Sequence, residues 1–86
     1  MTHTHYALIN EDNDVVAVIK RANINDKLQA AKINDKVQEA IEDETGDRVL
    51  KYELIETDYC NYQARFILEG DVNVKHTYTL RPTWEY

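Results

Sequence analysis

Two apolar runs near the start of the chain predict a β-hairpin. Residues 6–9 and 15–19 are apolar at consecutive positions and rich in β-branched side chains, and the polar residues 11–14 between them are typical of a turn. Because both runs are apolar throughout, neither face of these strands is clearly exposed to water. This pattern predicts a central position in a sheet, or a cover over the second face.

Three further strands are predicted after a helix stop at Gly46, over residues 48–57, 62–69 and 72–80. Apolar and polar residues alternate in each of them, which predicts one face toward a core and one toward water. The positions predicted to face the core are Leu50, Tyr52, Leu54, Tyr62, Ala64, Phe66, Leu68, Val72, Val74, His76, Tyr78 and Leu80.

The connections between these strands are short. Gly70 and Asp71 predict a tight turn, residues 58–61 form a longer hairpin tip, and Pro82 ends the last strand. The element order is strand, strand, helical segment, strand, strand, strand. This order predicts an α+β fold: an antiparallel sheet of about five strands with the helical segment on one face.

The helical segment repeats a short pattern, because INDKLQ at 24–29 is followed by INDKVQ at 33–38. At about 100° per residue, this shift turns a helix by about 900°, so the second copy lies on the opposite side. The apolar residues form two stripes: Ile24, Leu28 and Ala31 on one, and Ile33, Val37, Ala40 and Ile41 on the other. A straight helix cannot press both stripes against one sheet.

Two arrangements resolve this conflict. In the first, which we expect, the helix breaks or bends near residues 32–34, since a capping box begins at Asp26 and another at Asp35. In the second, the helix is continuous, one stripe packs on the sheet, and the other is an apolar patch for a second molecule. Continuity is favoured by the absence of Pro and Gly from residues 28–44.

Length and composition predict one small domain over residues 1–86. Of the 86 residues, 43% are hydrophobic and 30% are charged, as in an ordinary folded chain. The formal net charge is −6, and residues 24–47 carry three basic and seven acidic residues. The sequence contains no basic cluster, so we expect no direct binding to nucleic acid, whereas a partner with a basic surface fits the acidic middle segment.

The chain lacks the sequence features of exported, membrane and most enzymatic proteins. No apolar run approaches the ~20 residues that cross a bilayer, and the N-terminus does not resemble a signal peptide. Cys60, the single cysteine, cannot form an internal disulfide, so we expect a cytoplasmic protein. Without serine, and with glycine only at Gly46 and Gly70, the chain has neither a serine nucleophile nor a phosphate-binding loop. We expect no enzymatic activity and no cofactor.

The sequence offers two sets of candidate contact residues for a protein partner. The first set is acidic and lies at the end of the helical segment, where the helix dipole disfavours negative charge. It consists of Glu39, Glu42, Asp43, Glu44 and Asp47. The second set is aromatic and lies outside the strand pattern: Tyr59 at a hairpin tip, and Trp84 and Tyr86 in the tail. A solvated helix face is the simpler interpretation of the first set, and a tail folded over its own sheet is an alternative for the last two aromatics.

These features predict a small acidic protein-interaction module, an inhibitor or adaptor of the kind that some phages encode, which binds a basic or nucleic-acid-binding protein. One form is a nucleic-acid mimic, whose carboxylates take the place of phosphates. The alternative is a self-associating homodimer that buries the second helical stripe or the outer strand positions Val49, Ile55 and Ile67. A further, less favoured alternative is a metal-dependent enzyme with His3, His5 and His76 as zinc ligands.

Overall fold

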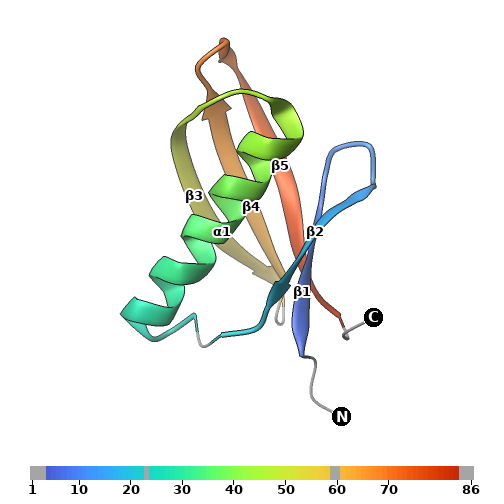
Figure 1. Cartoon of the computed structure of the whole chain (residues 1–86), viewed down its shortest axis with the longest axis vertical. Helices are drawn as coiled ribbons and strands as arrows, with labels where there is room; N and C mark the ends of the chain where they lie inside the picture. The colour runs from blue at the N-terminus through green and yellow to red at the C-terminus, as the bar shows by residue number, and fades with distance from the viewer. Residues whose placement is uncertain (1–3, 23, 59–60, 84–86) are drawn as a thin grey trace.

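The described part of the chain forms five strands and one helix, in the order that the sequence predicts (Figure 1). The computed structural model describes residues 4–22, 24–58 and 61–83. The elements are β1 (His5–Ile9), β2 (Val15–Lys20), α1 (Lys27–Thr45), β3 (Val49–Asp58), β4 (Asn61–Leu68) and β5 (Asp71–Thr83). The predicted α+β class, with the helix between the second and third strands of an antiparallel sheet, is confirmed.

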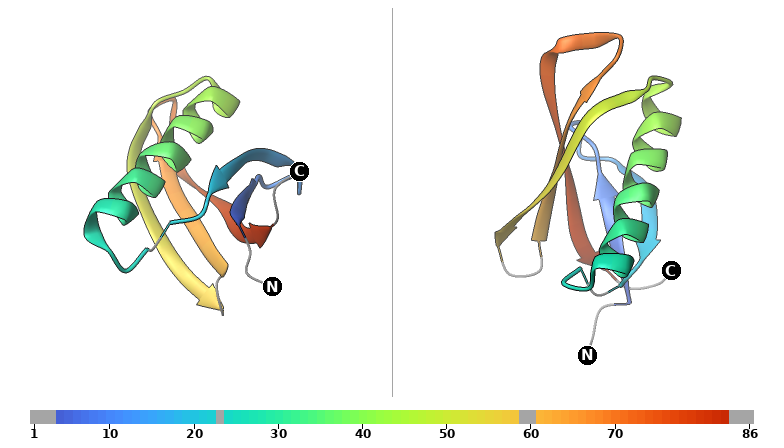
Figure 2. Two further views of the ribbon diagram at one scale, coloured as in Figure 1. Left: turned by 60° about the horizontal axis from the view of Figure 1, so that its bottom comes forward. Right: turned by 90° about the vertical axis from the view of Figure 1, so that its left-hand side faces the viewer.

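Neighbouring strands pair antiparallel in the order β2-β1-β5-β4-β3. The last strand therefore lies in the middle of the sheet. It pairs with β1 from His5↔Thr83 to Ile9↔Thr79, and with β4 on its other side. The sheet curves around α1, which contacts the two edge strands β2 and β3 (Figure 2).

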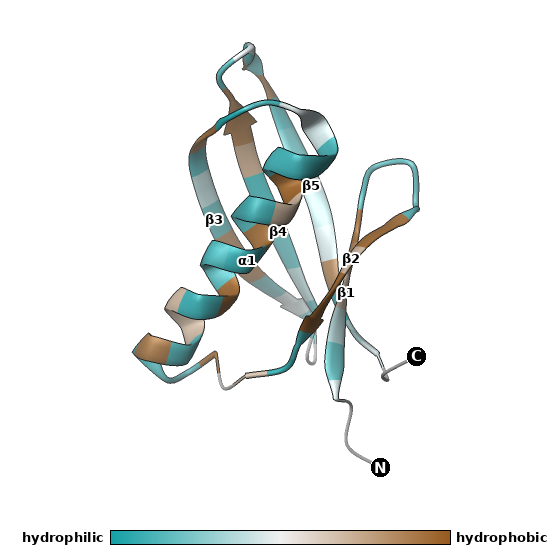
Figure 3. Ribbon diagram, viewed as in Figure 1, coloured by the Kyte–Doolittle hydropathy of each residue, from teal (hydrophilic) through white to brown (hydrophobic). Residues whose placement is uncertain are grey.

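The predicted central position is correct for β1 and wrong for β2. Residues 6–9 of β1 are all buried, because β1 lies between β2 and β5. In contrast, β2 is an edge strand although it is apolar along most of its length (Figure 3). Its side chains Val15 and Val18 are 52% and 43% exposed.

Helix α1 is continuous, so the expected break near residues 32–34 is wrong and the continuous helix of the alternative is confirmed. Asp26 caps its start by accepting hydrogen bonds at Oδ1 from the backbone N–H groups of Leu28 (2.9 Å) and Gln29 (3.2 Å). Gly46 ends it in the left-handed conformation (φ 68°), as predicted. Asp35 lies in the interior of α1, because good helix formers without Pro or Gly carry the helix through the second capping signal.

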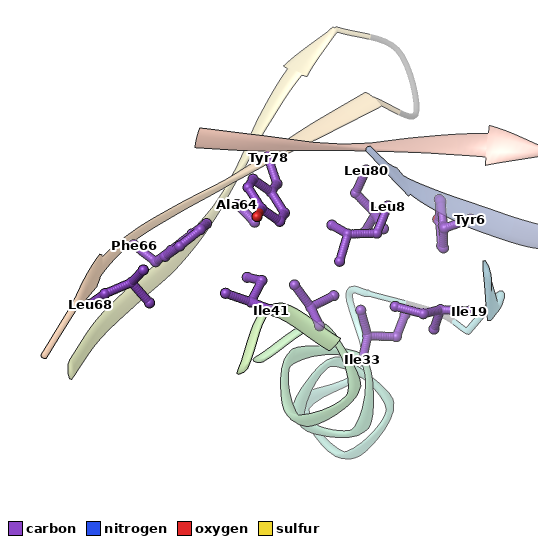
Figure 4. Close-up of a cluster of buried hydrophobic side chains, with 11 residues drawn as sticks. Tyr6, Leu8, Ile19, Ile33, Ile41, Ala64, Phe66, Leu68, Tyr78 and Leu80 are labelled. Carbon is purple, nitrogen blue, oxygen red and sulfur yellow. The ribbon is translucent and has the colours of Figure 1, made fainter. Parts of the chain in front are cut away.

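One apolar stripe of α1 faces the sheet and the other does not. Ile33, Val37 and Ile41 are fully buried against the concave face of the sheet (Figure 4). Leu28, on the opposite stripe, is 78% exposed. The two stripes also conflict less than the sequence predicts, because Ile24 precedes the helix and packs against the core from the β2–α1 linker. The core consists of Tyr6, Leu8, Ile19, Ile33, Val37, Ile41, Ala64, Phe66, Leu68, Tyr78 and Leu80.

A β-bulge at the start of β3 reverses two predicted positions. Val49 pairs with Leu68 and Lys51 pairs with Ile67, so Leu50 is the extra residue. Val49 packs against the core, whereas Leu50, which we predicted to face it, is 49% exposed. The sequence pattern alone does not place a bulge, and every position before it changes face.

The start of β5 also differs from the prediction. Leu68 pairs with Asp71, so the turn consists of Glu69 and Gly70 instead of Gly70 and Asp71. The register of β4 and β5 shifts after this turn, and Val72 and Val74 are exposed instead of core-facing. At its other end β5 continues past Pro82 to Thr83, because β1 still pairs with it there.

The two stripes of α1 differ in a testable way. We expect Ile41→Ala to lower the free energy of unfolding by about 2–5 kcal/mol, because it leaves a cavity beneath the sheet. Leu28→Ala is the matched control and is expected to change it by less than about 0.5 kcal/mol, because that side chain is exposed. Urea unfolding measures both values. Similar losses in the two variants would contradict the observed orientation of the helix.

Alkaline pH tests the burial of Tyr52. Burial raises the pKa of its hydroxyl, which donates a hydrogen bond to Oδ1 of Asn34 at 3.0 Å. Tyrosines of the unfolded chain ionise near pH ~10, whereas folded Tyr52 keeps its proton to higher pH. The unfolded state then binds fewer protons, so the free energy of unfolding falls above pH ~10, by up to about 1.4 kcal/mol per pH unit for this group.

We therefore expect Tyr52→Phe to show a smaller decline in stability with rising pH than the wild type, although it starts from lower stability at neutral pH. Urea unfolding at a series of pH values between about 9 and about 11 gives the two slopes. Equal slopes would show that Tyr52 ionises in the folded protein as readily as in the unfolded chain.

Candidate functional site

Four segments that carry acidic residues lie toward one end of the sheet, in the upper part of Figure 1. The segments are the β1–β2 turn, the last turn of α1, the α1–β3 loop and the β4–β5 turn with the first residue of β5. We call this group the acidic end: Glu11, Asp12, Asp14, Glu42, Asp43, Glu44, Asp47, Glu69 and Asp71.

Hydrogen bonds between distant parts of the chain hold the acidic end together. Asn10 in the β1–β2 turn donates from Nδ2 to Oε1 of Glu44 in α1, at 3.4 Å. The backbone N–H of Gly70 in the β4–β5 turn donates to Oδ2 of Asp47 in the α1–β3 loop, at 2.9 Å. These contacts place the β1–β2 turn beside the helix end, and the helix end beside the second turn.

The carboxylates of the helix end and of the β1–β2 turn also act on Tyr78. Burial raises the pKa of the Tyr78 hydroxyl, and the charges of Glu44, Glu11 and Asp12 raise it further because each disfavours a phenolate. Residues from the helix end and from the β1–β2 turn therefore act on the same buried hydroxyl.

The acidic end carries the net negative charge of the protein. Its segments, residues 10–14, 42–48 and 69–71, contain nine acidic residues and one basic residue, Arg48. The rest of the chain contains seven acidic and nine basic residues. A charge separation of this kind produces a local potential that attracts cationic groups to one end of the molecule.

Two of the predicted contact residues support the backbone. Glu42 is half-buried, and its Oε2 accepts a hydrogen bond from the backbone N–H of Val49 at 3.0 Å, beside the bulge of β3. Asp47 is also half-buried and accepts at Oδ1 from the backbone N–H of Arg48 at 2.8 Å, in addition to its bond with Gly70. A Cβ at Gly70 would lie 2.6 Å from Asp47 Oδ2, so a larger residue there would displace the Asp47 carboxylate.

The other predicted acidic residues are exposed. Asp43 and Glu44 lie on the surface of the last turns of α1, and Glu39 lies one turn earlier, facing β2 together with Asp43. The predicted aromatic contacts Tyr59, Trp84 and Tyr86 lie outside the described residues. Their role as partner contacts stays a prediction.

His76 lies in the middle of the acidic end. Its ring stacks on Phe66 with centroids 5.4 Å apart, and its Nδ1 lies 2.9 Å from Oε1 of Glu11. Because an ionised carboxylate can only accept, Nδ1 is the donor of this hydrogen bond. Its Nε2 is buried and lies 3.8 Å from Oδ2 of Asp71, beyond hydrogen-bonding distance. His76 therefore joins the β1–β2 turn to the core.

The structure does not bring His5 and His76 together. His5 pairs with Thr83, which is seven residues along β5 from His76, or roughly 23 Å of strand. His3, the third residue of the proposed zinc set, lies outside the described residues. Within residues 4–22, 24–58 and 61–83, no three His, Cys, Asp or Glu side chains are grouped as metal ligands.

Three basic residues that are distant from one another in the sequence lie together on the convex face of the sheet, opposite α1. Lys51, Arg65 and Lys75 come from three adjacent strands and line a depression of about 610 Å³ together with Glu53 and Ile67. These cations are at least ten residues apart in the sequence, so no cluster is visible there. The strand order alone brings them together.

Sequence reasoning found about half of the acidic end. From the sequence, Glu11, Asp12 and Asp14 are predicted only as part of a polar turn, Asp71 only as part of a tight turn and Glu69 only as the end of a strand. Acidic residues in both turns were a visible signal. The sequence does not show that β1 pairs with β5, and this pairing places the turns beside the helix end.

Comparison of the chain with protein-family models, with curated proteins and with solved structures found no match. In the part of the chain that the structure describes, no helix is long and apolar enough to cross a membrane. The geometry of the acidic end is therefore the basis for a functional proposal.

Asp47 and Asp43 allow a matched test of the two kinds of carboxylate. We expect Asp47→Ala to lower the free energy of unfolding by about 1–3 kcal/mol, because two backbone N–H groups lose their charged acceptor. Asp43→Ala removes the same charge from an exposed site and is expected to change stability by less than about 0.5 kcal/mol. Urea unfolding at constant salt compares them. An equal effect would mean that Asp47 contributes only its charge.

Proposed function

We propose that this protein is a small protein-interaction module, an inhibitor or adaptor, whose acidic end binds a basic surface of another protein. The observation that carries this proposal is that nine carboxylates from separate segments lie at one end of the sheet, in segments that contain one basic residue. Clustered like charges repel one another, and a basic partner would relieve that repulsion on binding.

The acidic end is also rigid enough to serve as a binding surface. In the β1–β2 turn, Oδ1 of Asn10 accepts hydrogen bonds from the backbone N–H groups of Asp12 (3.0 Å) and Asp14 (2.9 Å). On the other side, Glu42 and Asp47 fix the α1–β3 loop. Loops that are held before binding lose less conformational entropy when a partner arrives, which favours affinity.

A nucleic-acid mimic is one specific form of this function. In that form the carboxylates occupy the phosphate-binding groove of a nucleic-acid-binding protein. Such binding depends on many charge pairs at once, so its affinity would fall steeply with rising salt. Competition by DNA or RNA would identify this form among other basic partners.

Affinity capture from the source organism with two matched triple variants tests the proposal. The first, Asp12→Asn, Asp14→Asn and Glu44→Gln, neutralises exposed carboxylates of the acidic end and keeps Glu42 and Asp47, which hold the backbone. The second, Asp35→Asn, Glu53→Gln and Glu56→Gln, neutralises the same number of exposed carboxylates elsewhere. We expect a partner that binds the wild type and the second variant to be lost from the first.

Two results would contradict the proposal. Equal loss from both variants would mean that binding follows net charge and not the acidic end. A partner retained by both variants would use another surface. Circular dichroism and thermal melting of each variant confirm that the fold is intact, and a salt titration of the captured complex separates the mimic from a partner that binds mainly by apolar contacts.

A further inference from the structure

The two edges of the sheet differ in how they are protected against pairing. The β3 edge carries charged side chains at Lys51, Glu53, Glu56 and Asp58 and is distorted by the bulge at Leu50. Natural sheets use both devices to block unwanted strand pairing. The β2 edge has neither charge nor proline over residues 15–19, and its first charged side chain is Lys20 (Figure 3). Its only irregularity is a register shift near its start.

The free backbone groups of β2 can be assigned from its pairing with β1. The backbone N–H of Arg21 donates to the carbonyl oxygen of Thr4 at 3.0 Å. In an antiparallel pair such bonded positions alternate, so Ile19 and Ala17 also point their backbone groups toward β1. Val18 and Lys20 point theirs away from it. Among the described strands none lies beyond β2, so these groups have no partner in the sheet.

An open cleft runs beside this edge, between β2 and α1. Its volume is about 340 Å³, and it is lined by Ala17 to Lys20 on one side and by Lys36, Glu39, Ala40 and Asp43 on the other. The cleft therefore offers on one wall the backbone groups of β2 that no described strand pairs with, and on the other wall one basic and two acidic side chains around the small Ala40.

We propose that two copies of this protein pair antiparallel through β2, with Val18 opposite Val18, and form one continuous sheet from two five-stranded sheets. In this register the two Val18 residues exchange both of their outward backbone hydrogen bonds. Their side chains, 43% exposed in a single copy, meet on the convex face. The arrangement is a two-fold, self-complementary interface.

The charges of the cleft favour a second copy over an unrelated strand. Helix α1 runs alongside β2 (Figure 1), so a two-fold axis at Val18 places the two helices antiparallel beside each other. Lys36 and Asp43 lie on opposite sides of Ala40 in the cleft wall. With Ala40 near the axis, Lys36 of each copy would lie toward Asp43 of the other copy. The surface is complementary to itself.

The same axis separates the acidic ends. Antiparallel β2 strands run in opposite directions, so the β1–β2 turns of the two copies lie at opposite ends of the joined sheet. Apart from Asp43, which faces Lys36 of the other copy, the carboxylates of the two acidic ends therefore do not approach each other. A dimer of this kind would present two equivalent acidic ends to its partners.

Sedimentation equilibrium from micromolar to millimolar concentration, with matched variants of Val18, tests this interface. Val18→Lys places two ammonium groups opposite each other at the axis and is expected to weaken dimerisation by about a hundredfold or more. Val18→Thr keeps a β-branched side chain at this position and is expected to retain the dimer. Because the side chain is half exposed in one copy, both variants should fold, and thermal melting checks this.

A charge exchange distinguishes this interface from any other. Lys36→Asp and Asp43→Lys should each weaken the dimer, and the double variant should restore it, because the cross-pair is inverted and not lost. A concentration-independent monomer would overturn the proposal. A dimer that is unaffected by Val18→Lys, or not rescued by the double variant, would overturn it as well, since another surface would then hold the copies together.

Discussion

The pairing of β1 with β5 is the interaction on which the rest of the structure depends. The chain makes a hairpin from β1 and β2, a helix, and a meander from β3 to β5, and only the β1–β5 ladder joins the hairpin to the meander in one sheet. Leu8 and Leu80 lie opposite each other in this ladder and are both fully buried. Without this ladder, the buried side chains of α1 would pack on only half of the sheet. The β1–β2 and β4–β5 turns would then not both lie beside the end of the helix.

This ladder also marks what the sequence can and cannot predict. Local signals sufficed for the class of fold, for the order of elements and for both ends of the helix, since Asp26 and Gly46 act through their own neighbours. The strand order joins residues more than seventy positions apart, such as His5 and Thr83, and no local pattern contains that information. The helix break was predicted from a second capping signal at Asp35, but helix propensity outweighed that signal.

Only part of the candidate site can be predicted from local sequence patterns, for the same reason. The helix-end carboxylates were visible in the sequence because they violate a local rule, whereas the turns that complete the acidic end are ordinary until the β1–β5 ladder places them. The sequence also could not distinguish Glu42 and Asp47, which hold backbone N–H groups, from Asp43 and Glu44, which are exposed. That distinction depends on the bulge of β3 and on the turn at Gly70, and both are tertiary features.

The carboxylates at the end of α1 are unfavourable for the helix, and hydrogen bonds within the fold offset part of that cost. Helix α1 has no basic residue in its last turn, where a carboxylate opposes the helix dipole by about 0.3–1 kcal/mol each. The hydrogen bonds of Glu42 and Asp47 offset part of this, but Asp43 and Glu44 have no basic side chain beside them in the sequence. These carboxylates contrast with the rest of the chain, which carries slightly more basic than acidic residues. The basic partner that we propose would supply the positive charge that the neighbouring sequence lacks.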